Sequence, residues 1–208
     1  LPLGYLGVDM FFVISGYVIS LSTIRNIRSE KRFNWQFFYR RRVRRLLPGA
    51  AIVAVSSSLF ALLALSPFGP QQKTATMLMS VATYSTNFAL IKSNYYALDS
   101  TSNPLLHFWS LAVEEQFYLF WPVLILIFFR IKGRTGVFYG VLTVALASFL
   151  FSLYLTERSP VWSFYILPTR AWEMAAGGLI LFTSPRIRKG FFNRSQWGFL
   201  SLVLISIS

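Results

Sequence analysis

Two adjacent carboxylates, Glu114 and Glu115, lie in a run of residues that is otherwise apolar enough to form a membrane helix. A charged side chain at the centre of a bilayer costs roughly 2.5–3.5 kcal/mol on insertion scales. A chain therefore keeps such a group in a membrane span only where it faces a cavity, a partner or a substrate. These glutamates are the first candidates for a chemical role.

Other polar residues share a helical face with the first of these glutamates. With Glu114 they form a series at intervals of three or four positions: His107, Ser110, Glu114 and Tyr118. This spacing places an imidazole, a hydroxyl, a carboxylate and a phenol on one side of a helix. Such a face suits proton transfer and the binding of a polar substrate, so we interpret it as the wall of an active site in the membrane.

The two glutamates cannot share a face, because neighbouring residues of a helix point about 100° apart. We expect one to meet a buried arginine and the other a hydroxyl or a backbone group. Arg170 is the obvious arginine, since it too stands at a span boundary, but Glu173 follows three residues later and can pair with it instead. We predict that Glu114 is needed for turnover and that Glu115 matters less if it pairs with an arginine.

Composition indicates a membrane protein. The 208 residues are 55% hydrophobic and include 21 Phe, and the mean hydropathy is +0.54, unlike a soluble domain. The absence of cysteine and the single histidine exclude thiol chemistry, disulfides and histidine-cluster metal sites. The net charge of +13 would suggest nucleic acid on a soluble protein, but here the basic residues separate apolar spans and indicate topology, with no nucleic-acid partner.

The apolar stretches predict an all-α fold, a polytopic membrane bundle with about six or seven apolar helices, each crossing needing about 20 residues. They run over 6–24, 46–66, 76–91, 108–129, 137–155, 171–183 and from 197 onward. The chain opens without Met and stops within an apolar run. We therefore expect residues 1–208 to be part of a single membrane domain, truncated at both ends.

Basic clusters predict the topology. Nine of the twenty basic residues lie between the first two stretches, and smaller clusters follow at 130–134 and 186–194. The positive-inside rule places all three in the cytoplasm, which allows one net crossing between 46–66 and 130. The stretch 76–91 is short and polar, so we expect it to be re-entrant or partly buried in protein. The alternative, in which the cluster at 130–134 lies outside, stays open.

Four segments in order carry a family resemblance: Gly7-Val-Asp-Met-Phe-Phe-Val-Ile-Ser-Gly16, Phe38-Tyr-Arg-Arg-Arg-Val-Arg-Arg-Leu-Leu-Pro48, His107-Phe-Trp-Ser-Leu-Ala-Val-Glu-Glu-Gln-Phe-Tyr118 and Leu167-Pro-Thr-Arg-Ala-Trp-Glu173. Across the whole chain they closely resemble the bacterial membrane acyltransferase-3 family, the O-antigen acetylase type.

The resemblance implies a multi-pass protein of the bacterial inner membrane. It would transfer an acyl group, usually acetyl, from a cytoplasmic coenzyme A thioester to a hydroxyl of an extracytoplasmic glycan or lipid-linked oligosaccharide. Family acceptors include lipopolysaccharide, peptidoglycan and exopolysaccharide sugars. Acyl-CoA is then a donor substrate, with no permanently bound cofactor and no metal, and membrane lipids surround the protein.

Family members begin with an earlier helix that carries an Arg and, further on, the His usually assigned to catalysis. No residue of this chain matches that His, because His107 belongs to a different motif. We therefore expect the chain by itself to be inactive.

A dense group of arginines opens the 46–66 span. Either it anchors the topology, or it binds the phosphates of coenzyme A, because guanidinium groups grip phosphate oxygens bidentately. With the resemblance we favour donor binding by Arg41, Arg42, Arg44 and Arg45. An Arg-x-x-Arg clamp fits Arg42 with Arg45, or Arg41 with Arg44.

The remaining candidates carry two interpretations each. Asp9 is either a helix N-cap or interfacial acid, or a partner that orients a catalytic His or an Arg of a preceding helix. His107 is a structural histidine, a glycan contact or a proton relay. We predict a catalytic group of Glu114, Glu115, Asp9 and His107.

Substrate contacts are predicted at Trp109, Ser110, Tyr118, Arg170 and Glu173. The aromatic residues most simply pack or form membrane-interface belts, with sugar stacking by Trp109 as a further alternative: Trp109, Trp121, Trp162, Tyr165 and Trp172.

Acyl transfer requires a base for the attacking hydroxyl and donors for the oxyanion. Direct transfer and a covalent relay through Ser15 or Ser110 both stay open, and the sequence shows no base beside either serine. A transporter or flippase would also use intramembrane carboxylates and a re-entrant segment. An inactive remnant is the third alternative, and the lack of an internal repeat disfavours transport.

Overall fold

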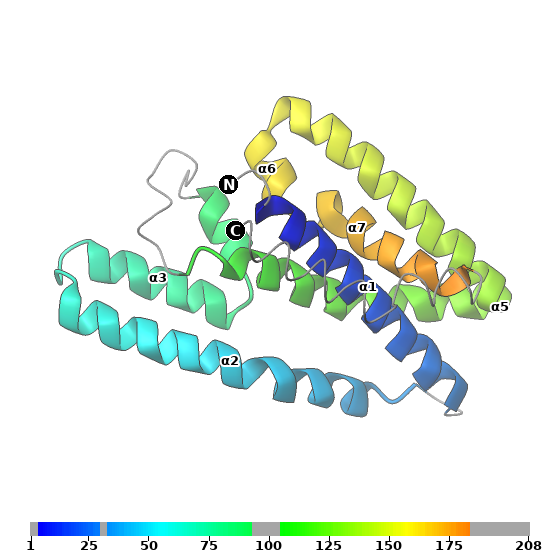
Figure 1. The fold of residues 1–208 in the computed structure, drawn as a ribbon, viewed down its shortest axis with the longest axis horizontal. Helices are drawn as coiled ribbons and strands as arrows, with labels where there is room; N and C mark the ends of the chain where they lie inside the picture. The colour runs from blue at the N-terminus through cyan, green and yellow to red at the C-terminus, as the bar shows by residue number, and fades with distance from the viewer. Residues whose placement is uncertain (1–3, 30–32, 93–104, 184–208) are drawn as a thin grey trace.

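The computed structural model describes residues 4–29, 33–92 and 105–183, and these form helices and short connections with no strand among them (Figure 1). The elements in chain order are α1 Gly4–Ser29, α2 Trp35–Ala64, α3 Pro70–Ala82, α4 Thr86–Lys92, α5 Phe108–Arg158, α6 Pro160–Tyr165, α7 Leu167–Leu179 and the 3-10 turn η3 Ile180–Phe182. The predicted all-α class is confirmed, and the final stretch from 197 lies outside the described residues.

Local sequence signals explain several helix starts. The side chain of Asn34 caps α2 by accepting a hydrogen bond from the Phe37 amide at 3.0 Å. Gly69 precedes α3 with a φ of +91°, and Pro70 fills the first helical position, where a missing N–H costs nothing. These signals set where the short α3 helix turns back along α2 (Figure 1).

Three of the described helices, α1, α2 and α5, are long and apolar enough to cross a membrane. The 51 residues of α5 would extend about 75 Å if straight, more than twice the hydrocarbon core. The helix instead kinks at Lys132 and Gly133, where Gly133 takes a φ of +55°, and its limbs 108–131 and 134–158 form a V (Figure 1). These limbs coincide with the predicted stretches 108–129 and 137–155.

The predicted number of six or seven spans stays a prediction. The stretch 171–183 falls on α7 and η3, and the 13 residues of α7 are shorter than the roughly 20 that a crossing needs. The stretch 76–91 is interrupted as expected: α3 ends at Ala82, α4 begins at Thr86, and Tyr84 between them has a positive φ of 50°. Its expected re-entrant position in a bilayer stays a prediction.

The core lies where α1, α7 and both limbs of α5 pack together. Glycines allow α1 and α7 to cross with their backbones in contact: a Cβ at Gly16 would overlap the Met174 carbonyl, and one at Gly177 would overlap the Val13 carbonyl. Close by, the Trp121 indole N–H donates to Ser20 Oγ at 2.7 Å. This crossing fixes the register of α1 against α7.

Basic residues gather toward one end of the long axis, where α1 ends, α2 begins and α5 kinks (Figure 1). Arg28, Arg41, Lys132 and Arg134 are all exposed there. This arrangement agrees with the predicted common side for the first two basic clusters. The third cluster, at 186–194, lies outside the described residues.

The glycine crossing predicts opposite effects for two matched substitutions. Gly16→Ala should destabilise the protein by about 1–3 kcal/mol, because the new methyl group forces the α1 and α7 backbones apart. Gly49→Ala adds the same group to α2, where nothing lies within 4 Å, so the gain in helix propensity should leave stability equal or higher. Thermal unfolding in detergent would check this, and equal melting temperatures for the two variants would contradict the close crossing.

Candidate active site

Glu114 is 4% exposed and is surrounded by hydroxyl groups. Its Oε1 accepts hydrogen bonds from Ser15 Oγ of α1 and from Tyr118 OH, one turn further along α5. The expectation that one glutamate meets a hydroxyl is therefore confirmed for Glu114. The structure also places a carboxylate beside Ser15, where the sequence showed no base.

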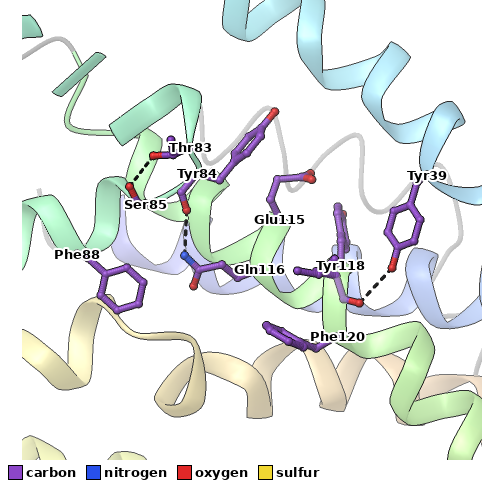
Figure 2. A pocket seen from close by; sticks show the side chains of 10 residues that line it. Tyr39, Thr83, Tyr84, Ser85, Phe88, Glu115, Gln116, Tyr118 and Phe120 are labelled. Atoms are coloured by element: carbon purple, nitrogen blue, oxygen red, sulfur yellow. Dashed lines mark hydrogen bonds between the residues drawn. The ribbon is translucent and has the colours of Figure 1, made fainter. Parts of the chain in front are cut away.

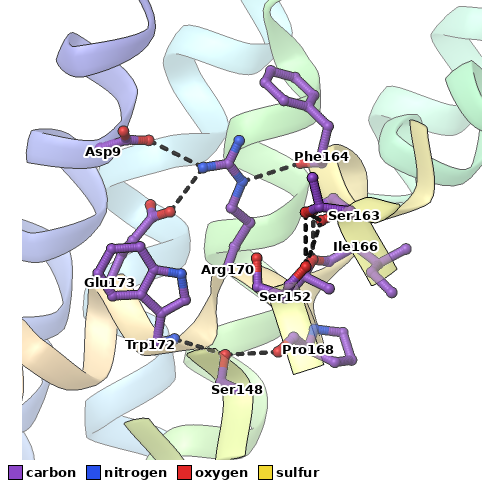
Figure 3. Close-up of polar contacts among 12 residues, drawn as sticks. Asp9, Ser148, Ser152, Ser163, Phe164, Ile166, Pro168, Arg170, Trp172 and Glu173 are labelled. Atoms are coloured by element: carbon purple, nitrogen blue, oxygen red, sulfur yellow. Dashed lines mark hydrogen bonds and ion pairs between the residues drawn. The ribbon is translucent and has the colours of Figure 1, made fainter. Parts of the chain in front are cut away.

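Arg170 joins α7 to α1 (Figure 3). Its Nη1 lies 2.8 Å from Glu173 Oε1 and 3.1 Å from Asp9 Oδ1, and its Nε donates to the Phe164 carbonyl at 3.2 Å. The expected pairing of Arg170 with Glu114 or Glu115 is wrong, and the alternative pairing with Glu173 is confirmed. The reason is that Arg170 points toward α1, away from the α5 glutamates.

Asp9 also differs from expectation. It lies inside α1, which begins at Gly4, so it is not an N-cap. Its partner is Arg170 of α7, which lies 161 positions later in the chain. Glu173 is 1% exposed, and its second oxygen, Oε2, has no hydrogen-bond partner among the described residues. Two carboxylates therefore share one guanidinium in this Asp9–Arg170–Glu173 cluster.

A pocket of about 550 Å³ opens between α2, the α3–α4 break and α5 (Figure 2). Its lining combines hydroxyl, amide and carboxylate groups with aromatic walls: Tyr39, Thr83, Tyr84, Ser85, Phe88, Glu115, Gln116, Tyr118, Leu119 and Phe120. Among the described residues Glu115 has no ion pair, and its buried Oε1 has no hydrogen-bond partner. This pocket can hold a polar ligand beside a carboxylate.

Tyr118 connects the pocket to Glu114, because it lines the pocket while its hydroxyl donates to Glu114. The Arg42 guanidinium lies 3.7 Å from the centre of the Tyr118 ring and 4.9 Å from that of Phe38. Tyr39 OH donates to the Leu119 carbonyl at 3.1 Å and holds the start of α2 against α5. A cation, a phenol and two carboxylates therefore meet at this place.

The predicted arginine group divides in the structure. Arg42 turns inward onto Tyr118, whereas Arg41 and Arg44 are exposed. The side chain of Arg45 lies outside the described residues. Of the two predicted clamps, the structure therefore leaves Arg41 with Arg44 open to a ligand.

The predicted polar face of α5 is only partly assembled. Glu114 and Tyr118 touch, but Ser110 Oγ donates to the His107 carbonyl at 3.1 Å, and the His107 side chain is exposed where α5 begins. Trp109 is 6% exposed and packs on Phe12, Phe164 and Tyr165, which agrees with packing and not with a membrane-interface belt.

Other predicted aromatic residues divide between core and surface. Trp121 and Tyr165 are buried, Trp172 packs on Phe149, and Trp162 is exposed, so among these only Trp162 has the exposure that a belt residue needs.

Four residues of the pocket or its supports were not among the predicted site residues: Tyr39, Tyr84, Gln116 and Asn87. Their contacts join segments about 30 or more positions apart, so local spacing carries no signal for them. The sequence did carry signals of another kind: Gln116 directly follows the two glutamates in an apolar run, Tyr39 lies in a segment that carries the family resemblance, and Asn87 lies in the polar stretch 76–91.

The buried hydroxyl at Ser15 predicts a loss of stability on its removal. Ser15→Ala should lower the free energy of unfolding by about 1–3 kcal/mol, because Glu114 loses a donor in the core. Ser22→Ala on the exposed side of α1 is the matched control and should leave stability unchanged. Thermal unfolding of the two variants side by side would check this, and a stable Ser15→Ala protein would contradict it.

Comparisons with known proteins identify the family of the chain. The chain matches the acyltransferase domain family over residues 2–208. It is 31% identical over 189 residues to the peptidoglycan O-acetyltransferase OatA of Listeria monocytogenes, covering 88% of this chain and 30% of that protein. It is 28% identical over 192 residues to the putative peptidoglycan O-acetyltransferase YrhL of Bacillus subtilis, covering 89% and 30%.

A putative O-acetyltransferase of Staphylococcus aureus is 32% identical over 186 residues, covering 88% of this chain and 30% of that protein. The chain thus spans 30% of the length of these curated relatives. No solved structure matches it. Its match along residues 2–208, together with the long apolar helices, shows that the chain belongs to the acyltransferase-3 family of membrane proteins.

Proposed function

We propose that this chain is the acyl-transferring membrane part of an O-acetyltransferase. It moves an acetyl group from a coenzyme A thioester to a hydroxyl of a cell-envelope glycan, as a multi-pass protein of the bacterial inner membrane. The pocket carries the proposal: it places Glu115, with a buried and unpaired oxygen, beside Tyr118 in an otherwise apolar bundle. The names of two relatives, peptidoglycan O-acetyltransferases, support a glycan acceptor.

The reaction needs one proton acceptor and one group that stabilises negative charge. The acceptor hydroxyl attacks the thioester carbonyl, its proton passes to a base, and the carbon–sulfur bond breaks to release coenzyme A, whose sulfur takes up the proton. Glu115 is the base in this proposal because it lines the pocket. Arg42, stacked on Tyr118, brings positive charge close to the developing oxyanion.

Glu114 has a different role, because it does not line the pocket. It accepts the Tyr118 hydrogen bond and fixes the phenol at the pocket wall. We therefore propose Glu115 for proton transfer and Glu114 for positioning Tyr118. The sequence-based prediction gave the larger catalytic role to Glu114, so this assignment exchanges the roles of the two glutamates.

The donor phosphates bind at Arg41 and Arg44 in this proposal. Both side chains are exposed and three residues apart, which places them on one side of α2. Arg44 lies within about 8 Å along the helix axis of Tyr39, which lines the pocket. One extended ligand can therefore reach both the arginines and the pocket.

The alternative of a transporter or flippase loses support from the comparisons, since the named relatives are O-acetyltransferases. The Asp9–Arg170–Glu173 cluster fits a structural role in the enzyme, because it ties α1 to α7. It also presents one buried, unpaired carboxylate oxygen to any donor that enters.

Glutamate substitutions test the proposed roles. Glu115→Gln removes the base while keeping its shape, and we expect acetyl transfer in the intact protein to fall by about 100-fold or more with little change in melting temperature. Glu114→Gln should lower both turnover and melting temperature. The glutamine amide can place an N–H donor where the carboxylate accepts hydrogen bonds from neighbouring hydroxyl groups. Exposed Glu157 provides the control, Glu157→Gln. Near-normal turnover of Glu115→Gln would remove Glu115 from the reaction.

Arginine substitutions test donor binding. We expect the pair Arg41→Ala and Arg44→Ala to raise the apparent KM for acetyl-CoA at least tenfold, since charge-assisted hydrogen bonds contribute about 1.5–3 kcal/mol each. Lys replacements should preserve topology but not the bidentate grip. The pair Arg25→Ala and Arg28→Ala removes the same charge from exposed positions near the end of α1. Equal KM values for the two double variants would leave Arg41 and Arg44 as topology anchors.

A further inference from the structure

We infer that Gln116 and Asn87 are positioning residues for the pocket, which hold the backbone between α3 and α4 so that Tyr84 and Ser85 form its wall. The inference deepens the proposed function and rests on it only for the effect on catalysis. The structural part stands on hydrogen bonds, burial and backbone conformation.

Gln116 uses both hydrogens of its side-chain amide to hold the backbone between α3 and α4. We call the hydrogen-bonded pair of Gln116 and Asn87 the bracket. Its Nε2 donates to the Tyr84 carbonyl at 3.0 Å and to Asn87 Oδ1 at 3.0 Å (Figure 2 shows the first bond). Tyr84 is the one non-glycine residue with positive φ among those that the structure describes, at 50°. A side chain disfavours that conformation, so it persists where other contacts enforce it. Gln116 supplies such a contact.

Asn87 anchors the other side of the bracket. It is 0% exposed, and its Nδ2 donates to the Tyr165 carbonyl at 3.1 Å. Tyr165 is the last residue of α6, so this bond reaches a carbonyl at a helix end, where external donors commonly bind. Asn87 thus satisfies a helix end in the core while it fixes the start of α4.

The same helix end links the pocket to the second polar cluster. The neighbouring Phe164 carbonyl accepts from Arg170 Nε at 3.2 Å. Adjacent carbonyls of α6 are therefore held by Asn87 from the pocket side and by Arg170 from the Asp9–Arg170–Glu173 cluster. Asn87 therefore connects the α3–α4 break to the same helix end that Arg170 holds.

The pocket wall itself follows from this bracket. Thr83, Tyr84 and Ser85 form the break and line the pocket opposite Glu115, and the hydroxyls of Thr83 and Ser85 lie 2.8 Å apart. Gln116 lines the pocket as well, but both amide hydrogens are already used. The positioning role therefore rests on Nε2, through the backbone that it holds.

The test uses a thiol placed at the break. The chain has no cysteine, so Ser85→Cys gives a single reactive site whose labelling rate by a small maleimide reports opening of the pocket wall. Adding Gln116→Met removes both donors without adding charge, and we expect labelling to accelerate about tenfold, the factor that corresponds to roughly 1.4 kcal/mol. Gln36→Met on the exposed surface of α2 is the matched control and should leave the rate unchanged.

Asn87→Asp provides a second variant. It keeps the acceptor for Gln116 and removes the donor to Tyr165, so it should accelerate labelling by a smaller factor than Gln116→Met. Melting temperatures identify any variant that fails to fold. If only one of Gln116→Met and Asn87→Asp folds, the labelling rate of the folded variant decides the inference. If neither folds while Gln36→Met does, the bracket is needed for folding and the positioning role is overturned.

Activity separates the inference from the proposed function. With acetyl-CoA as donor and a soluble peptidoglycan oligosaccharide as acceptor, Gln116→Met should raise the acceptor KM several-fold more than it lowers kcat. An unchanged labelling rate would overturn the positioning role whatever the activity. Faster labelling in an intact protein that transfers no acetyl group before mutation would leave the bracket standing and refute the proposed function. Faster labelling with unchanged KM and kcat would show that the bracket does not control the reaction.

Discussion

The contact between the backbones of α1 and α7 is the constraint on which the rest of the structure depends. Gly16 faces the Met174 carbonyl and Gly177 faces the Val13 carbonyl, so no side chain fits between the helices there. This register brings Asp9 to Arg170. It also brings α1 against α5, where Ser15 meets Glu114 and Ser20 meets Trp121. One steric requirement therefore sets both polar clusters.

Polar groups inside an apolar bundle need partners, and the exceptions are informative. Two buried side-chain oxygens lack a hydrogen-bond partner among the described residues, one on Glu115 and one on Glu173. Both belong to carboxylates next to a satisfied neighbour, Glu114 in the first case and Arg170 in the second. In each pair one group takes part in hydrogen bonds or ion pairs of the fold, and the other has a buried oxygen without such a partner. This difference in hydrogen bonding is the physical reason for assigning one group of a pair to positioning and the other to chemistry.

Local pattern predicted the elements better than the contacts between them. The all-α class, the break near 76–91 and the interruption between 108–129 and 137–155 followed from hydropathy and from polar residues within apolar runs. A hydroxyl partner for Glu114 was predicted by type, but Ser15 lies 99 positions away, and no spacing rule reaches that far. Arg170 was assigned to the α5 glutamates because the sequence does not show which way α7 turns. The pocket was missed because Tyr39, Tyr84 and Glu115 meet only after folding.

The loose attachment of α2 has a consequence for the role of the lipid. This helix packs mainly on α3, and most of its apolar side chains beyond the first turns are exposed, including Ile52, Leu59 and Leu63. Tyr39 and Arg42 connect its start to α5. Along this length α2 presents apolar surface that lipid acyl chains or further protein can cover. Because Tyr39 both attaches the start of α2 and borders the cavity, whatever covers the apolar length of this helix acts on the cavity through that attachment.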